Sequence, residues 1–326
     1  MDIWRGLQEV PPQPQGSVVT IGVFDGMHRG HCGLISRAVR EARTEGLPCI
    51  MVTFDPHPVS VFLPGHAPTS LMSVDSRLRR AAELGIDGVL VIDFRCELAG
   101  LSPQEYVSTL LLKTLSARSV YVGDNFTFGR DASGTTTVLE ALCSEVGIKA
   151  HIVELLRDEG TCISSTVVRD ALAQGDVVAA QRALGRRFSV SGQIVHGNGR
   201  GGRELGFPTA NMYFPDCVAI PADGVYAGWF TVVNEGDIDG DMEPKVAYPA
   251  AISVGTNPTF GDDRRSVESF VMGHEADLYG RRATVEFVAH LRDMLKFNGI
   301  EDLLTAIRQD VSDAYRALGI DSDEEN

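Results

Sequence analysis

Two histidines three residues apart mark the first segment whose residue types could do chemistry. Residues 22–31 read Gly-Val-Phe-Asp-Gly-Met-His-Arg-Gly-His, after an apolar run and before a helical pattern. A helix N-terminus offers free amides and a positive dipole end to phosphates, and glycines allow close approach of the backbone. Two imidazoles there would stabilise charge developing on an α-phosphate and on leaving pyrophosphate. The alternative is a glycine turn with two surface histidines. The candidate nucleotide-binding residues are Gly22, Phe24, Asp25, Gly26, His28 and His31, the two histidines being the catalytic pair.

Three further polar segments follow predicted strands, at residues 53–58, 122–129 and 163–169. The carboxyl ends of parallel strands line one cleft, so these segments are expected to meet there. In the last segment, Ser164, Ser165 and Thr166 supply hydroxyls and helix-start amides, and Arg169 follows one turn later as a phosphate clamp. Taken alone, the same serines and threonine would also make an ordinary helix cap.

The glycine–histidine motif resembles that of the nucleotidyltransferase superfamily, whose members transfer a nucleotidyl group and release pyrophosphate. Together, the four segments resemble the FMN adenylyltransferase domain of the prokaryotic bifunctional riboflavin kinase/FAD synthetases. The resemblance implies that His28 and His31 bind the ATP phosphates. It also implies that the nucleotide is surrounded by Asn125, Ser164, Ser165 and Arg169.

A flavin requires flat apolar walls for its ring system. The aromatic and proline residues nearest these segments are Phe62, Tyr106, Phe128, Pro56 and Pro58, which we take as candidate flavin contacts. Each aromatic residue has an alternative interpretation as part of the core.

The second half of the chain carries a different candidate phosphate site. A basic glycine loop at residues 196–203 precedes Gly-Phe-Pro-Thr-Ala-Asn at residues 206–211. The loop is neither a Walker A motif nor a protein-kinase glycine loop. The hexapeptide resembles the riboflavin kinase signature, which implies that Gly206, Thr209 and Asn211 bind ATP and that Thr209 and Asn211 hold Mg²⁺. Their oxygen donors suit magnesium beside phosphate. The alternative is a turn stabilised by Pro208 and Asn211.

Glu268 lies within an otherwise apolar predicted strand, where a carboxylate needs a reason. As a general base it would accept the proton of the terminal riboflavin hydroxyl while that oxygen attacks the γ-phosphate. The alternative is an outward-facing strand residue. Arg292 and Phe297 match the end region of the same family, which implies that they close over flavin or nucleotide.

The elements that must position these residues fall into two groups. Residues 1–185 alternate apolar runs with helical patterns, which predicts a doubly wound parallel sheet and, by the resemblance, an FMN adenylyltransferase domain. The expected strands are Val18–Phe24, Cys49–Phe54, Gly88–Phe94, Ser119–Val122 and Ala150–Leu155.

Residues 186–326 favour a small antiparallel barrel closed by one helix at Ile300–Leu318, and the resemblance implies a riboflavin kinase domain. In the acidic stretch Asn234–Glu243, alternating aspartates resemble part of a calcium-binding loop, but the glutamate that such a loop needs is missing. The stretch is therefore expected to be a solvated turn. The expected strands are Phe188–Val195, Val225–Val233, Val246–Val254, Val267–Met272 and Ala283–His290.

The composition of the chain argues against several other classes of protein. The net charge of −15 disfavours nucleic-acid binding. No apolar run reaches the ~20 residues that span a bilayer, and six scattered cysteines fit a reducing compartment, so we expect a cytoplasmic enzyme. The expected ligands are ATP, ADP, riboflavin, FMN and FAD. Two alternatives stay open, a chain with one working activity and a non-catalytic flavin sensor, and the oligomeric state is not readable.

Overall fold

The structure is a computed structural model that describes residues 1–63, 65–94, 98, 100–158, 160–196, 206–257, 262–297 and 299–321. Its contacts divide the chain into two compact units, Met1–Ser165 and Thr166–Asn326. A search of the described helices finds no segment with the length and apolar character to cross a membrane.

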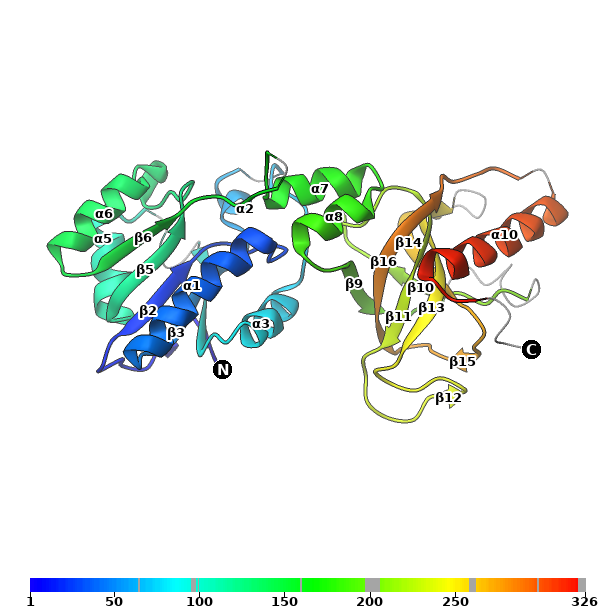
Figure 1. The fold of residues 1–326 in the computed structure, drawn as a ribbon, viewed down its shortest axis with the longest axis horizontal. Helices are drawn as coiled ribbons and strands as arrows, with labels where there is room; N and C mark the ends of the chain where they lie inside the picture. Colours follow the sequence, from blue (N-terminus) through cyan, green and yellow to red (C-terminus); the bar gives the residue numbers. More distant parts are fainter. Residues whose placement is uncertain are drawn as a thin grey trace. The chain divides into compact units, whose positions relative to one another are not determined.

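The N-terminal unit is built on a six-stranded parallel sheet with the order β1-β4-β3-β2-β5-β6. Figure 1 labels four of these strands, namely β2, β3, β5 and β6. The strands of the sheet are β1 (Asp2–Arg5), β2 (Ser17–Ile21), β3 (Cys49–Phe54), β4 (Gly88–Ile92), β5 (Ala117–Gly123) and β6 (Lys149–Val153). This confirms the predicted fold class of the first half. The first strand was not predicted, because its four residues carry no apolar pattern. It is held by tertiary packing, since a Cβ at Gly88 would lie 2.4 Å from the ring of Trp4.

Helices cover both faces of this sheet, as the apolar strands require. One face packs against α1 (Arg29–Glu45) and α3 (Val74–Glu83) through residues such as Ile35 and Leu78. The other face packs against η2 (Val107–Thr114), a π-helix, and α6 (Thr136–Glu145). Shorter elements are η1 (Leu7–Glu9), α2 (Pro58–Phe62), α5 (Pro103–Tyr106), η3 (Arg130–Ala132), β7 (Arg157–Asp158) and β8 (Thr161–Cys162).

The strand order reverses between β2 and β5, because the chain builds outward from β2 to β4 and then crosses to β5 and β6. Ligands of doubly wound sheets bind in the crevice beyond the carboxyl ends of strands at such a reversal. The glycine–histidine segment follows β2, and the segment with Asn125 follows β5. The topology therefore brings these two candidate segments to one crevice.

Two helices precede the barrel of the second unit, namely α7 (Ser165–Ala173) and α8 (Val177–Leu184). The structure groups them with the second unit because α8 packs against β9 and β16. The compact units thus divide after Ser165, whereas the sequence boundary was placed after Gly185, at the left-handed C-cap of α8.

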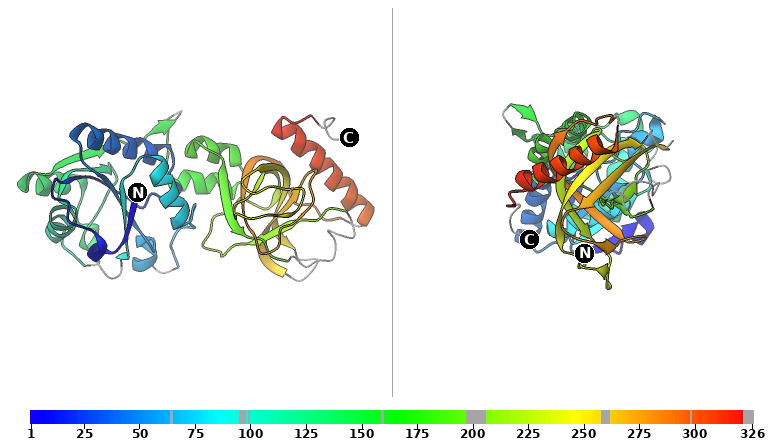
Figure 2. Two further views of the ribbon diagram at one scale, coloured as in Figure 1. Left: turned by 90° about the horizontal axis from the view of Figure 1, so that it is seen from below. Right: turned by 90° about the vertical axis from the view of Figure 1, so that its right-hand side faces the viewer.

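The C-terminal unit is a six-stranded antiparallel sheet with the order β10-β14-β13-β11-β16-β9, which curves into a barrel (Figure 2). A bridge between Val195 and Asn211 joins the chain after β9 to β10 and so closes the sheet. The predicted barrel is confirmed. Its strands are β9 (Phe188–Gln193), β10 (Ala210–Tyr213), β11 (Gly224–Val232), β13 (Ala247–Asn257), β14 (Asp262–Val271) and β16 (Arg282–Arg292).

Side chains alternate between the interior of the barrel and its outer face. Tyr226, Ile252 and Phe287 are among the fully buried residues. The outer face packs against α10 (Ile300–Leu318), whose bounds match the predicted helix, through a cluster that includes Phe270 and Ala314. The acidic stretch is not purely a turn, because β12 (Asp239–Gly240) pairs with β15 (Ala276–Asp277).

Candidate active sites

The two histidines of the first segment lie together at the start of α1. His28 is the N-cap residue, and its Nδ1 accepts a hydrogen bond from the backbone N–H of His31 at 3.3 Å. The two imidazole rings stack with centroids 3.6 Å apart, and Phe24 contacts His31 edge-on at 5.2 Å. Phe24 itself has φ +54° and is buried. A Cβ at Gly22 would lie 3.0 Å from the Phe24 ring, which explains the glycine.

The environment of His31 favours a neutral imidazole. Burial lowers its pKa well below the ordinary value, and repulsion from His28 in its protonated form and from Arg77 lowers it further. Its Nδ1 atom is buried and makes no hydrogen bond within the described part of the chain. The hydrogen bond to Nδ1 of His28 places the proton of a neutral His28 ring on Nε2. A neutral His31 ring and the Nε2–H of His28 can therefore both donate hydrogen bonds.

Asp25 is placed as an anchor of this loop. Its side chain is 3% exposed, and both carboxylate oxygens accept from the backbone N–H of Leu71 at 3.0 Å. Its carbonyl accepts from Oγ of Ser165 at 2.8 Å. The segment with Ser164 and Ser165 therefore lies against the loop that carries the two histidines, as a site shared by these segments requires. The Asp25 carboxylate is already bonded to the backbone of Leu71.

A cavity of about 780 Å³ and another of about 580 Å³ lie along α1. The smaller is lined by Arg29, Gly30 and Gly33 of α1, by Asp124 after β5 and by Leu155 after β6. It lies where the strand order reverses. Asn125 is exposed in the turn beside Asp124, and Arg169 follows on α7 in the second unit.

The candidate flavin contacts differ in how far they are buried. Tyr106 and Phe128 are 2% and 5% exposed and belong to the core, with ring centroids 5.1 Å apart. Their burial favours the alternative interpretation as core residues. Pro56 and Pro58 are half-buried at the start of α2, and the side chain of Phe62 lies outside the described residues.

Arg77 is a buried charged residue that the sequence analysis did not single out. It lies on the buried face of α3 beside Leu78, and it donates to Oγ1 of Thr53 and to the carbonyl of Phe54. In the sequence, only its position on the apolar face of an amphipathic helix distinguishes Arg77 from other arginines. That pattern alone does not indicate a functional residue.

In the second unit, strand pairing places two candidate residues, Asn211 and Glu268, in one row with Ser253. Asn211 of β10 lies opposite Glu268 of β14, and Glu268 lies opposite Ser253 of β13. Oε1 of Glu268 accepts from Oγ of Ser266 at 3.0 Å. Asn211 itself lies in β10, after the segment with Pro208 that was considered as a turn.

The Asn211 side chain is almost fully buried and turns back to Thr209. Its Nδ2 donates to the Thr209 carbonyl at 2.9 Å and to the Thr209 hydroxyl at 3.3 Å. These two bonds use only the amide nitrogen of Asn211. The amide oxygen of Asn211 and the hydroxyl oxygen of Thr209 can still accept. Such hard oxygen donors fit Mg²⁺. Gly206 precedes them with φ +80°, whereas residues 197–205 and 258–261 lie outside the described residues.

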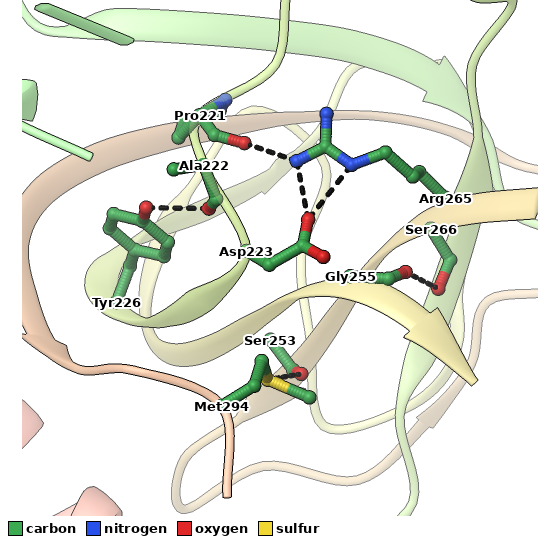
Figure 3. Close-up of polar contacts among 9 residues, drawn as sticks. All are labelled: Pro221, Ala222, Asp223, Tyr226, Ser253, Gly255, Arg265, Ser266 and Met294. Carbon is green, nitrogen blue, oxygen red and sulfur yellow. Dashed lines mark hydrogen bonds and ion pairs between the residues drawn. The ribbon is translucent and has the colours of Figure 1, made fainter. Parts of the chain in front are cut away.

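Neighbouring contacts fix the end of the row (Figure 3). Arg265 donates to Oδ1 of Asp223 at 2.8 Å and to the carbonyl of Pro221 at 2.7 Å. The sulfur of Met294 lies 3.8 Å from Oγ of Ser253. These contacts tie the segment before β11 to β14, which carries Glu268, and the segment after β16 to the neighbouring strand β13.

Arg292 is engaged within the protein. Its Nε and Nη2 donate to the two carboxylate oxygens of Asp310 on α10 at 2.7 and 2.6 Å. Its guanidinium also lies 5.9 Å from the ring centroid of Phe297. Arg292 was expected to close over flavin. Its contacts give it a second candidate role, which is to hold α10 and the segment before α10 against the barrel.

Comparison with known proteins follows the same division of the chain. A family model described as FAD synthetase matches residues 10–167, and one described as riboflavin kinase matches residues 184–318. The bifunctional riboflavin kinase/FMN adenylyltransferase of Pseudomonas fluorescens is 37% identical over 99% of both chains. The protein of the same name from Escherichia coli (strain K12) is 34% identical over 98% of this chain and 99% of its own. A crystal structure described as a macrolide-efflux protein from Streptococcus pneumoniae has a TM-score of 0.83 and 30% identity over 96% of this chain and 98% of its own.

Proposed function

Because the chain belongs to the bifunctional riboflavin kinase/FMN adenylyltransferase family, we propose that it converts riboflavin to FMN and FMN to FAD with ATP. The C-terminal unit is the kinase and the N-terminal unit is the adenylyltransferase. The observation that carries this proposal is the pairing of Glu268 with Asn211 in one unit and the stacked histidines at the start of α1 in the other.

In the kinase site, Glu268 accepts the proton of the terminal riboflavin hydroxyl. That oxygen forms a bond to the γ-phosphorus, the bond to the β,γ-bridging oxygen breaks, and ADP leaves. The hydrogen bond from Ser266 orients the Glu268 carboxylate. Thr209 and Asn211 would hold Mg²⁺, which neutralises charge on the phosphates when it is bound.

In the adenylyltransferase site, an oxygen of the FMN phosphate attacks the α-phosphorus of ATP, and pyrophosphate leaves. His28 and His31 donate hydrogen bonds to the oxygens on which negative charge develops. The amides at the start of α1 add to this stabilisation. Asn125, Ser164, Ser165 and Arg169 remain our candidates for contacts with the rest of the nucleotide.

The test separates the two activities by single substitutions in each unit. His31→Ala is expected to abolish FAD formation from FMN while riboflavin is still phosphorylated. Glu268→Gln is expected to slow FMN formation by about 10²- to 10⁴-fold, the usual contribution of a general base, while supplied FMN is still adenylylated. Loss of both activities by either change would contradict two separate sites.

The flavin-sensor alternative is tested with the unaltered protein. Incubation with riboflavin, ATP and Mg²⁺, followed by chromatography, is expected to yield FMN and FAD. An unchanged riboflavin peak would favour the sensor. A parallel incubation with EDTA in place of Mg²⁺ tests the metal, and we expect no FMN there. We propose the cytoplasm as the compartment, on the basis of the scattered cysteines.

A further inference from the structure

Arg77 is a buried cation in the N-terminal unit. It lies on the face of α3 that packs against the sheet, beside Leu78 and Ala81, and it is 5% exposed. Arginine is rarely buried without partners, because removal of the guanidinium from water is costly. An apolar residue at this position would pack against the sheet without that cost. Packing alone therefore does not explain an arginine here.

The hydrogen bonds of Arg77 connect α3 to the loop of the two histidines. Its Nη1 donates to Oγ1 of Thr53 at 2.9 Å and to the carbonyl of Phe54 at 3.1 Å. The Thr53 hydroxyl in turn donates to the carbonyl of Val23 at 2.9 Å. Val23 precedes Phe24, whose ring packs against His31. The relay thus runs from the guanidinium through the end of β3 to the backbone beside the histidines.

The charge of Arg77 also acts on this loop. Burial lowers the pKa of Arg77, while the carboxylates of Asp25 and Asp55 favour its charged form. The groups that disfavour protonation of His31 are, after burial, His28 in the same loop and Arg77 from α3. Arg77 therefore interacts electrostatically with two carboxylates and with His31, from a helix that carries no other candidate site residue.

We propose that Arg77 is a positioning residue for adenylyl transfer, which holds the histidine loop through Thr53 and Phe54 and places its positive charge close to that loop. This inference rests on the proposed adenylyltransferase function. A purely structural role would let any residue of similar volume replace Arg77, provided that the fold survives. A positioning role requires both the charge and the hydrogen-bond relay.

The test compares three variants with a control on the same helix. Arg77→Met removes the charge and the relay, Arg77→Lys keeps the charge, and Thr53→Val breaks the relay alone. Arg79→Met is the control, because Arg79 is exposed and donates to Ser76. For each variant, the kcat and KM of FAD formation, the rate of FMN formation, and the NMR titration of the His31 ring are measured.

We expect Arg77→Met to lower kcat for FAD formation by about 10²-fold, the effect of a small misplacement of reacting groups. The KM for ATP and the rate of FMN formation should change little, and the His31 titration should move to higher pH. Arg77→Lys should restore the His31 titration and part of the kcat. Thr53→Val should lower kcat by about 2- to 10-fold, the effect of one lost hydrogen bond, without moving the titration.

Wild-type kcat in Arg77→Met, or an unmoved His31 titration in that variant, would overturn the inference. If Arg77→Met does not fold, Arg77→Lys and Thr53→Val carry the test, and wild-type kcat in Thr53→Val is then the contrary result. The titration does not depend on turnover. Failure of the proposed function would appear separately, as absence of FAD formation by the wild-type protein.

Discussion

Asn211 and Glu268 lie directly opposite each other in the antiparallel pair of β10 and β14. They are far apart in the chain, and each belongs to a segment that the sequence singled out for a different task, phosphate binding and proton transfer. The strand pairing places both at one position of the barrel wall, beside Ser253 of β13. The register therefore places the proposed general base and the proposed ligand of the phosphates and Mg²⁺ side by side on two neighbouring strands.

Asn211→Ala is expected to impair the kinase reaction alone. The change removes the amide that bonds Thr209 and that we propose to face the metal. Substitution of groups that hold or orient a metal typically lowers activity by about 10- to 100-fold, so FMN formation should slow by about that factor. The same preparation provides the control, since adenylylation of supplied FMN should be unchanged. A wild-type rate of FMN formation would remove Asn211 from the site.

Gly30→Ala and Gly33→Ala form a matched pair on α1. A Cβ at Gly30 would lie 3.1 Å from Cε1 of His28, whereas a Cβ at Gly33 meets no atom within 4 Å. We expect Gly30→Ala to displace the His28 ring and to lower kcat for FAD formation by about 10²-fold. Gly33→Ala should instead raise the free energy of unfolding by about 0.5–1 kcal/mol, because alanine favours the helix.

Assays of FAD formation and thermal unfolding of both variants check this pair. Equal losses of activity in the two variants would show that the close contact with His28 does not matter. FMN formation serves as the control for the second unit in both cases.

The sequence predicted the elements with strong periodicity. Five strands of the parallel sheet, most strands of the barrel and the helix Ile300–Leu318 follow from apolar runs and caps that act over a few residues, whereas β1 does not. The strand β10 was missed, because Pro208 and Asn211 are turn residues in local statistics and only pairing with β14 makes this segment a strand.

The site was predicted where its residues form contiguous motifs, as with His28 and His31. Arg77 was missed because its partners, Thr53 and Phe54, come from another segment and are brought near only by the fold. For Tyr106, the choice between a flavin wall and a core residue depends on packing against η2 and α6, which periodicity does not resolve.

The stability of the N-terminal unit should depend on pH through His31. Its pKa in the folded protein lies below the ordinary value of 6.5, chiefly because of burial and then because of His28 and Arg77. As the pH falls through 6.5, the unfolded chain binds a proton at this residue that the folded protein does not. The free energy of unfolding therefore decreases with falling pH, by at most about 1.4 kcal/mol per pH unit.

Chemical denaturation between pH 7.5 and 5.5 measures this dependence. His31→Gln should flatten the curve below pH 6.5, because the residue that takes up the proton is gone. His66→Gln, at an exposed position, is the control and should leave the slope unchanged. The same slope in His31→Gln as in the wild type would contradict the neutral imidazole.

The ion pair of Arg292 with Asp310 should stabilise the second unit through α10. Asp310 is buried, and both its oxygens accept from Arg292, so Asp310→Ala leaves a half-buried guanidinium without this partner. We expect the free energy of unfolding to fall by about 1.5–3 kcal/mol. Asp313→Ala, which breaks an exposed pair with Arg316 one turn away, should change it by less than about 1 kcal/mol. If Arg292 also contacts flavin, Asp310→Ala will raise the KM for riboflavin at temperatures where the protein is fully folded. An unchanged KM together with the stability loss would assign Arg292 to holding α10 alone.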